Sequence, residues 1–195
     1  VVVTAITKAG FFIQTPDASA DSNPVTPEGI YVYTGTGTVP VSVAIGNMMQ
    51  VTGAVATFPA LNTQSHTPGA EIEAPSGGTL TITQVSTGNA LPAAIALTAT
   101  NLSSLGSIYQ LTPYEGMRVS FSSLTATSGT GGTLAETSET YTSNGQFYAV
   151  ITGTARPFRA PGIDLRDPAV PNTPSGVAVF DDNPERIFVD SGTLV

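Results

Sequence analysis

Short apolar runs separated by polar turns recur along the chain and predict strands. Residues 1–7 and 11–14 flank a short turn that ends in Gly10. This pattern predicts a β-hairpin, because glycine accepts the positive φ of a tight turn. Residues 30–34 form the next apolar run and predict a third strand.

A fourth apolar run, residues 48–58, carries Gly53 in its middle and predicts a strongly bent strand. Such a bend helps a sheet to close into a small barrel. Residues 61–64 and 71–73 are expected to supply a fifth strand, which completes the strand inventory of an OB-type barrel. We therefore expect an OB-like β-barrel domain over residues 1–85.

The rest of the chain predicts a second β-rich unit. Residues 86–112 are rich in turn-forming residues and are interpreted as a connector. Residues 113–195 contain further short apolar runs, and we expect a second unit there that could itself be OB-like. The proline-rich stretch 156–175 is expected to run as an irregular surface excursion with long loops.

The composition supports an all-β protein with a real core. The chain has 195 residues, of which 41% are hydrophobic and 10% charged, with 20 glycines and 15 prolines. Abundant threonine, serine and valine favour strands joined by turns. Cysteine is absent, so neither a disulfide framework nor a thiolate metal site can form.

The charge disfavours nucleic-acid binding. Six Lys and Arg residues face 14 Asp and Glu residues, so the net charge is −8 and the overall field repels polyanions. Lys8 is the only cation before Arg118, and any anion-contacting surface is expected at Arg156, Arg159 and Arg166. No apolar run approaches the length of about 20 residues that spans a bilayer. The low lysine content and acidic charge are typical of exported bacterial proteins, so we expect an extracellular or cell-surface location.

One loop has the composition of a calcium site. Asp17, Asp21 and Asn23 place oxygen ligands of the kind that Ca²⁺ prefers in a single polar loop. The spacing is not that of an EF-hand, so a solvated Asx-turn loop is the favoured interpretation. The single histidine, His66, has no histidine or cysteine partner for zinc, and a solvent-exposed position is expected. No other cofactor and no catalytic residue is predicted.

Acidic residues also gather near the C-terminus, and we expect structural ion pairs there rather than a two-metal site. The set comprises Asp164, Asp167, Asp181 and Asp182, interleaved with Arg159, Arg166 and Arg186.

Aromatic residues near the start of the chain offer a stacking surface. Tyr31 and Tyr33, with neighbouring phenylalanines, could stack bases or sugars as the strands of OB-type proteins do. Alternation places Phe11 on one face of its strand and Phe12 on the other, so at least one ring faces away from the core. The alternative, which the few aromatic residues favour, is that these rings build the core.

Six motifs along the chain resemble the OB-like accessory region that precedes the catalytic domain in large secreted bacterial nucleases of the endonuclease/exonuclease/phosphatase superfamily. They occur in the order seen in that family and cover nearly the whole chain. They are Gly-Phe-Phe-Ile-Gln at 10–14, Glu-Gly-Ile-Tyr-Val-Tyr at 28–33, Met-Gln-Val-Thr-Gly-Ala-Val at 49–55, Thr-Gly-Asn-Ala-Leu-Pro at 87–92, Tyr-Glu-Gly-Met-Arg-Val at 114–119 and Asn-Pro-Glu-Arg-Ile-Phe-Val-Asp at 183–190.

The resemblance implies a noncatalytic OB-like accessory module whose partner is a C-terminal catalytic domain of the same protein. The catalytic set of that family includes paired histidines, which this chain does not have, so no catalytic residue is carried over. We keep three hypotheses: a scaffold or substrate-presenting module of a nuclease, a carbohydrate-binding or cell-surface adhesion module, and a free-standing hydrolase.

Overall fold

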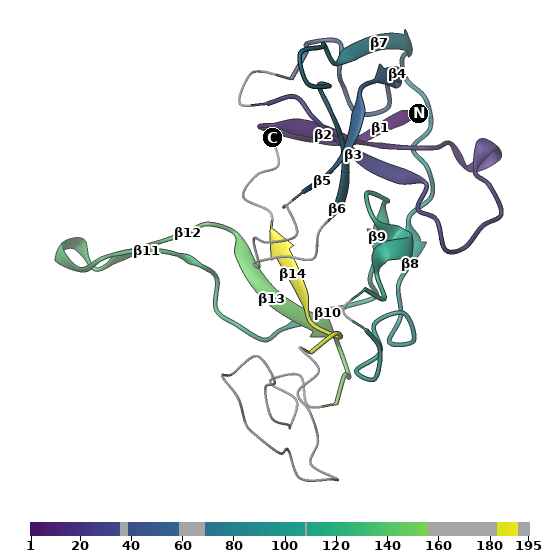
Figure 1. The fold of residues 1–195 in the computed structure, drawn as a ribbon. Coiled ribbons are helices and arrows are strands. Elements are labelled where there is room, and N and C mark those ends of the chain that lie inside the picture. The colour runs from purple at the N-terminus through teal and green to yellow at the C-terminus, as the bar shows by residue number, and fades with distance from the viewer. Residues whose placement is uncertain (36–38, 59–68, 108, 156–182, 191–195) are drawn as a thin grey trace, which may run out of the picture. The chain divides into compact units, whose positions relative to one another are not determined.

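The structure is a computed structural model that describes residues 1–35, 39–58, 69–107, 109–155 and 183–190 (Figure 1). These residues are nearly all strand and turn, and their helical segments are the 3-10 turns η1 (Asp17–Ser19), η2 (Thr112–Tyr114) and η3 (Glu136–Ser138). The predicted all-β class is confirmed. No helix in the described part of the chain has the length and apolar character needed to cross a bilayer.

The chain divides into two compact units, and their bounds differ from the predicted ones. Unit 1 contains Val1–Ala96 and Leu111–Ser120, and unit 2 contains Leu97–Gln110 and Phe121–Gly192. The expected connector is therefore split: residues 86–96 and 111–112 belong to unit 1, and residues 97–110 belong to unit 2. The reason is that residues far apart in the sequence pair with one another, as described below.

Unit 1 is built on a seven-stranded sheet with the order β5-β6-β3-β2-β1-β4-β7. The strands are β1 (Val2–Thr7), β2 (Gly10–Gln14), β3 (Gly29–Tyr33), β4 (Met48–Thr52), β5 (Ala54–Phe58), β6 (Gly69–Glu73) and β7 (Thr81–Ser86). The predicted hairpin is confirmed, since β1 and β2 pair antiparallel, and β3 pairs antiparallel with β2. The predicted segment 61–64 lies outside the described residues.

The strands β4 and β5 are two halves of one bent run. β4 pairs with β1 and β7, whereas β5 pairs with β6. Only Gly53 separates the two halves, and a Cβ atom there would lie 2.5 Å from the Glu73 carbonyl oxygen. Hydrogen-bonded pairings run from β4 through β1, β2, β3 and β6 to β5, where β6 pairs in parallel with β3. The sheet has β5 and β7 as its edges, and β5 returns to β4 through the chain at Gly53 and not through a strand pairing.

The segment Leu111–Ser120 joins unit 1 through two contacts with its first half. Within it, β9 (Val119–Ser120) pairs in parallel with β8 (Ile95–Ala96). The buried side-chain carbonyl of Gln14 accepts a hydrogen bond from the Arg118 backbone N–H at 2.9 Å. These long-range bonds explain why residues beyond position 85 complete the first unit.

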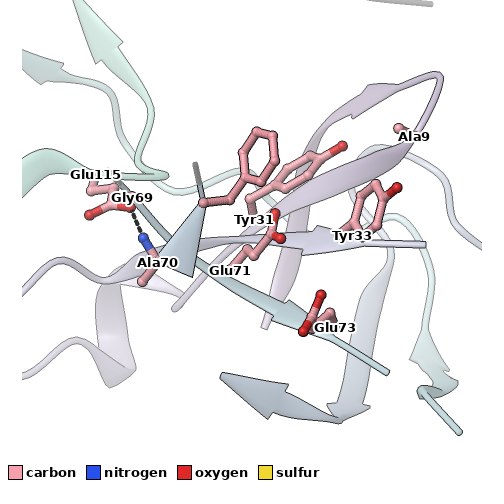
Figure 2. Close-up of a pocket in the computed structure, with 9 residues that line it drawn as sticks. Ala9, Tyr31, Tyr33, Gly69, Ala70, Glu71, Glu73 and Glu115 are labelled. Carbon is pink, nitrogen blue, oxygen red and sulfur yellow. Dashed lines mark hydrogen bonds between the residues drawn. The ribbon is translucent and has the colours of Figure 1, made fainter. Parts of the chain in front are cut away.

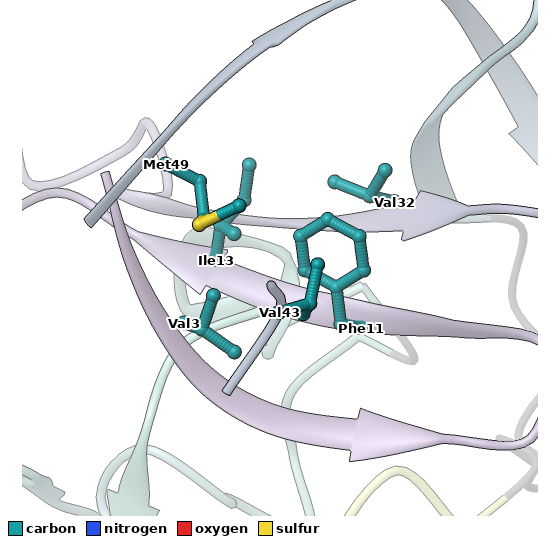
Figure 3. Close-up of a cluster of buried hydrophobic side chains, with 6 residues drawn as sticks. All are labelled: Val3, Phe11, Ile13, Val32, Val43 and Met49. Atoms are coloured by element: carbon teal, nitrogen blue, oxygen red, sulfur yellow. The ribbon is translucent and has the colours of Figure 1, made fainter. Parts of the chain in front are cut away.

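The core of unit 1 is a cluster of apolar side chains between its strands (Figure 3). Its buried members come from β1, β2, β3, β4 and the loop before β4: Val3, Phe11, Ile13, Val32, Val43 and Met49. Phe11 is fully buried while Phe12 is only partly buried, which confirms the predicted split of the two rings. Phe11 is the one aromatic residue of the cluster, so most rings of unit 1 serve elsewhere.

Unit 2 contains a long two-stranded ribbon with a third strand at its base. At the base, β13 (Gln146–Ile151) pairs with β10 (Leu124–Ala126) and β14 (Ile187–Asp190). Farther along, β11 (Gly132–Ala135) pairs with β12 (Thr140–Ser143) in the same register as β10 and β13, so all four strands belong to one hairpin. Figure 1 shows β11 and β12 extending from that base. All eight of their residues are exposed.

Candidate functional site

The candidate site is a pocket of about 580 Å³ in unit 1, on the outer side of the strands that enclose the core. Three aromatic rings and three carboxylates dominate its lining: Tyr31, Tyr33, Phe58, Glu71, Glu73 and Glu115. Figure 2 shows the two tyrosines on one strand and Glu71 and Glu73 on its neighbour. A concave site with apolar rings and a few polar groups is the usual form of a ligand-binding pocket.

Alternation along β3 explains why the tyrosines line this pocket. Val32 lies between them and is fully buried in the core, so Tyr31 and Tyr33 project from the opposite face. Both residues were predicted as ligand contacts, and the structure brings them together at one pocket. Both side chains are half-buried and lie outside the core cluster, so the alternative that they build the core is not supported.

Tyr31 is held in place by two neighbours. Its ring packs against Phe12 with centroids 4.9 Å apart and an interplanar angle of 52°. Its hydroxyl lies 2.9 Å from the Thr7 hydroxyl, which donates in turn to the Gly10 carbonyl. Burial raises the pKa of Tyr31 above its ordinary value, against the opposing effect of the Thr7 hydrogen bond. The phenol is therefore a neutral, fixed wall of the pocket at physiological pH.

Glu71 is the most buried polar group of the pocket. It pairs in register with Tyr31 across the parallel β3–β6 pair, and only 7% of its surface is exposed. Burial raises the pKa of Glu71, and the nearby charge of Glu73 raises it further. The part of the chain that the structure describes offers no hydrogen-bond donor to its carboxylate. A carboxylate that lacks a donor on a residue with so little exposed surface is a candidate for ligand contact.

The remaining carboxylates come from two different segments. Glu73 lies two residues after Glu71, so both side chains share one face of β6. Glu115 follows η2 and accepts a hydrogen bond from the Ala70 backbone N–H (Figure 2). The long-range pairing of residues 111–120 with unit 1 is what brings Glu115 to the pocket.

Sequence analysis missed all three carboxylates and Phe58. The Glu-Ile-Glu alternation at 71–73 could have placed two carboxylates on one face of a strand. The parallel pairing of β6 with β3, which sets them beside the tyrosines, leaves no local signal in the sequence.

Two of the predicted calcium ligands, Asp21 and Asn23, form local turns, whereas Asp17 makes a long-range hydrogen bond. Asp21 accepts a hydrogen bond from the Asn23 N–H at 2.7 Å, which is an Asx turn. Asn23 accepts from the Val25 N–H, and Asp17 accepts from the Ala93 N–H. Among the described residues, no three histidine, cysteine, aspartate or glutamate side chains lie close enough to hold a metal ion. Calcium binding by this loop stays a prediction.

The predicted anion-contacting residues Arg156, Arg159 and Arg166 lie outside the described residues, as do His66 and the acidic set at 164–182. Of the C-terminal arginines, Arg186 is described. Its guanidinium carbon lies 4.7 Å from the centre of the Tyr148 ring, which itself packs against Phe188. This arginine therefore has a packing role in unit 2.

No protein-family model matches the chain, and no curated protein or solved structure is significantly similar to it. The resemblance to secreted nucleases thus gains no support from these comparisons and stays a prediction.

Proposed function

We propose that this chain is a noncatalytic carbohydrate-binding module, with an OB-like first unit that holds a saccharide in the pocket of Tyr31 and Tyr33. The observation that carries the proposal is the pairing of aromatic rings with carboxylates in one concave site. A sugar ring has an apolar face that packs against an aromatic ring, and hydroxyl groups that donate to carboxylates.

The strand pairings support the OB-like architecture of the proposal. A sheet of short strands whose run β4–β5 bends at Gly53 and pairs with β1 and with β6 is compatible with a small Greek-key barrel, and such barrels bind oligosaccharides as well as oligonucleotides on their strand face. The acidic lining favours oligosaccharides over oligonucleotides, because three carboxylates would repel phosphate groups.

The hypothesis of a nuclease accessory module rests on the sequence resemblance. Its predicted contacts, Arg156, Arg159 and Arg166, are outside the described residues, and so the described part of the chain adds no specific observation in its favour. The extracellular location and the catalytic partner domain remain predictions of the same kind.

The proposal is tested by screening the purified chain on a glycan array and measuring the affinity of each hit by calorimetry. Tyr33→Ala should abolish binding, because it removes a ring of the pocket. Tyr109→Ala is the matched control, since Tyr109 is 58% exposed and belongs to unit 2. Binding that survives Tyr33→Ala would contradict the assignment of the pocket. Hydrolysis of a bound saccharide would contradict the noncatalytic part of the proposal.

Fluorescence anisotropy with single- and double-stranded DNA separates this proposal from the nuclease hypothesis. We expect no binding at low or moderate salt. Tight binding that weakens steeply with salt would favour a nucleic-acid partner and overturn the carbohydrate proposal.

A further inference from the structure

The charged side chains among the described lining residues of the unit 1 pocket are all acidic. Three carboxylates line it, and none of its described lining residues is a lysine, arginine or histidine. The faces of its aromatic rings also carry negative potential, because of the quadrupole of the π system. A neutral saccharide would leave this charge uncompensated.

Glu71 shows where a positive group would be held. The residue is 7% exposed, it lines the pocket, and its carboxylate has no hydrogen-bond donor within the described chain. A ligand that donates charge-assisted hydrogen bonds to it would remove the cost of that unpaired group. Tyr31, in register with Glu71, supplies the adjacent ring.

The arrangement of the carboxylates points to an organic cation. In the described residues, no group of three acidic or histidine side chains is close enough to hold a metal ion. The carboxylates are instead spread around a pocket of about 580 Å³ together with three rings. Carboxylates combined with aromatic faces are the usual surroundings of ammonium groups, which combine ionic hydrogen bonds with cation–π attraction.

We propose that the saccharide bound by this pocket carries a free, protonated amino group, so that the ligand class is an amino sugar without N-acetylation. The inference rests on the proposed carbohydrate-binding function. The ammonium group lies against Glu71, and the sugar ring packs against the tyrosines. N-acetylation removes the positive charge and replaces it with a bulky neutral amide, which Glu71 cannot pair with as an ion.

The test compares three saccharides of equal length by calorimetry with the full chain: an oligomer of glucosamine, the same oligomer fully N-acetylated, and an oligomer of glucose. We expect the glucosamine oligomer to bind on the order of tenfold or more tightly than the other two, which is the usual worth of a charge-assisted hydrogen bond.

Two variants locate the preference at Glu71. Glu71→Gln keeps the shape of the side chain and removes its charge, and it should erase most of the preference for glucosamine. Glu136→Gln is the matched control, since Glu136 is an exposed residue of unit 2 outside the pocket, and its preference should equal that of the wild type. Circular dichroism of each variant checks that it is folded.

The outcomes separate this inference from the proposed function. Preference for glucosamine that depends on Glu71 supports both. Equal binding of the three oligomers, or a preference that Glu71→Gln leaves intact, overturns the amino-sugar inference and leaves the carbohydrate-binding function standing. If none of the three binds and the glycan array is also negative, both fail.

Discussion

Gly53→Ala tests whether the bend between β4 and β5 is sterically required. The new Cβ atom would lie 2.5 Å from the Glu73 carbonyl oxygen, 2.7 Å from the Ile72 Cγ2 atom and 2.8 Å from the Leu80 Cδ1 atom. The nearest of these is a backbone atom of a paired strand, which cannot swing aside as a side chain does. Inserting a methyl group into such a packed site costs about 1–3 kcal/mol.

A second effect of Gly53→Ala acts on the free energy of unfolding in the opposite direction. Alanine restricts the unfolded chain more than glycine, and this stabilises a protein by about 0.4–1 kcal/mol wherever the site accepts a methyl group. Gly53 is not among the glycines with positive φ, so the backbone conformation by itself would accept alanine. The steric term is the larger one, and a net loss of about 1–2 kcal/mol is expected. For a domain of roughly 100 residues this lowers Tm by about 4–16 °C.

Differential scanning calorimetry and urea unfolding measure this change. Gly129→Ala is the matched control, because nothing lies within 4 Å of its Cβ position and its φ is not positive. That variant should leave Tm unchanged or slightly raised. A Gly53→Ala protein with an unchanged or higher Tm would refute the argument that the bend needs a residue without a Cβ atom.

Three further predictions concern separate parts of the chain. Gln14→Met removes the acceptor of the Arg118 N–H and should lower the free energy of unfolding, measured in urea, by about 1–3 kcal/mol. An unchanged midpoint would show that this hydrogen bond does not stabilise unit 1. Amides of β11 and β12 should exchange with deuterium faster than those of β13, since both strands are fully exposed; equal protection would mean that another surface covers the ribbon. Burial and the charge of Glu73 hold the pKa of Glu71 above its ordinary value, so the free energy of unfolding falls as pH rises from the ordinary pKa to the raised one. Glu71→Gln should remove this loss and raise the urea midpoint at neutral pH. A lowered midpoint would contradict the reasoning.

The local part of the fold could be predicted from the sequence, because it depends on short-range patterns. Alternation predicted that Phe11 and Phe12 lie on opposite faces of their strand, and the turn before Gly10 predicted the first hairpin; both features are present in the structure. The bounds of the units could not be predicted in this way. They depend on the pairing of β8 with β9 and on the bond between Gln14 and Arg118, which joins residues 104 positions apart.

The candidate site also has a part that local sequence patterns predict and a part that depends on long-range pairing. The placement of both tyrosines on one surface could be predicted because they alternate along one apolar strand. Their carboxylate neighbours could not, because a parallel partner strand has no fixed sequence distance from its neighbour. Glu115 reaches the pocket through a segment that local patterns assigned to the second unit.

The bend at Gly53 and the pocket are linked by a single structural feature, the strand β6. The bend lets the chain leave β4 and pair with β6 as β5, and β6 in turn lies parallel to β3. The pairing of β6 with both β5 and β3 therefore also sets Glu71 and Glu73 beside Tyr31 and Tyr33. The Cβ atom of Gly53→Ala would press on the backbone carbonyl of Glu73, and the side chain of Glu73 lines the pocket. We expect a displaced Glu73 carbonyl to shift the carboxylates of β6, so the affinity for the proposed saccharide should fall in Gly53→Ala even at temperatures where unit 1 is fully folded.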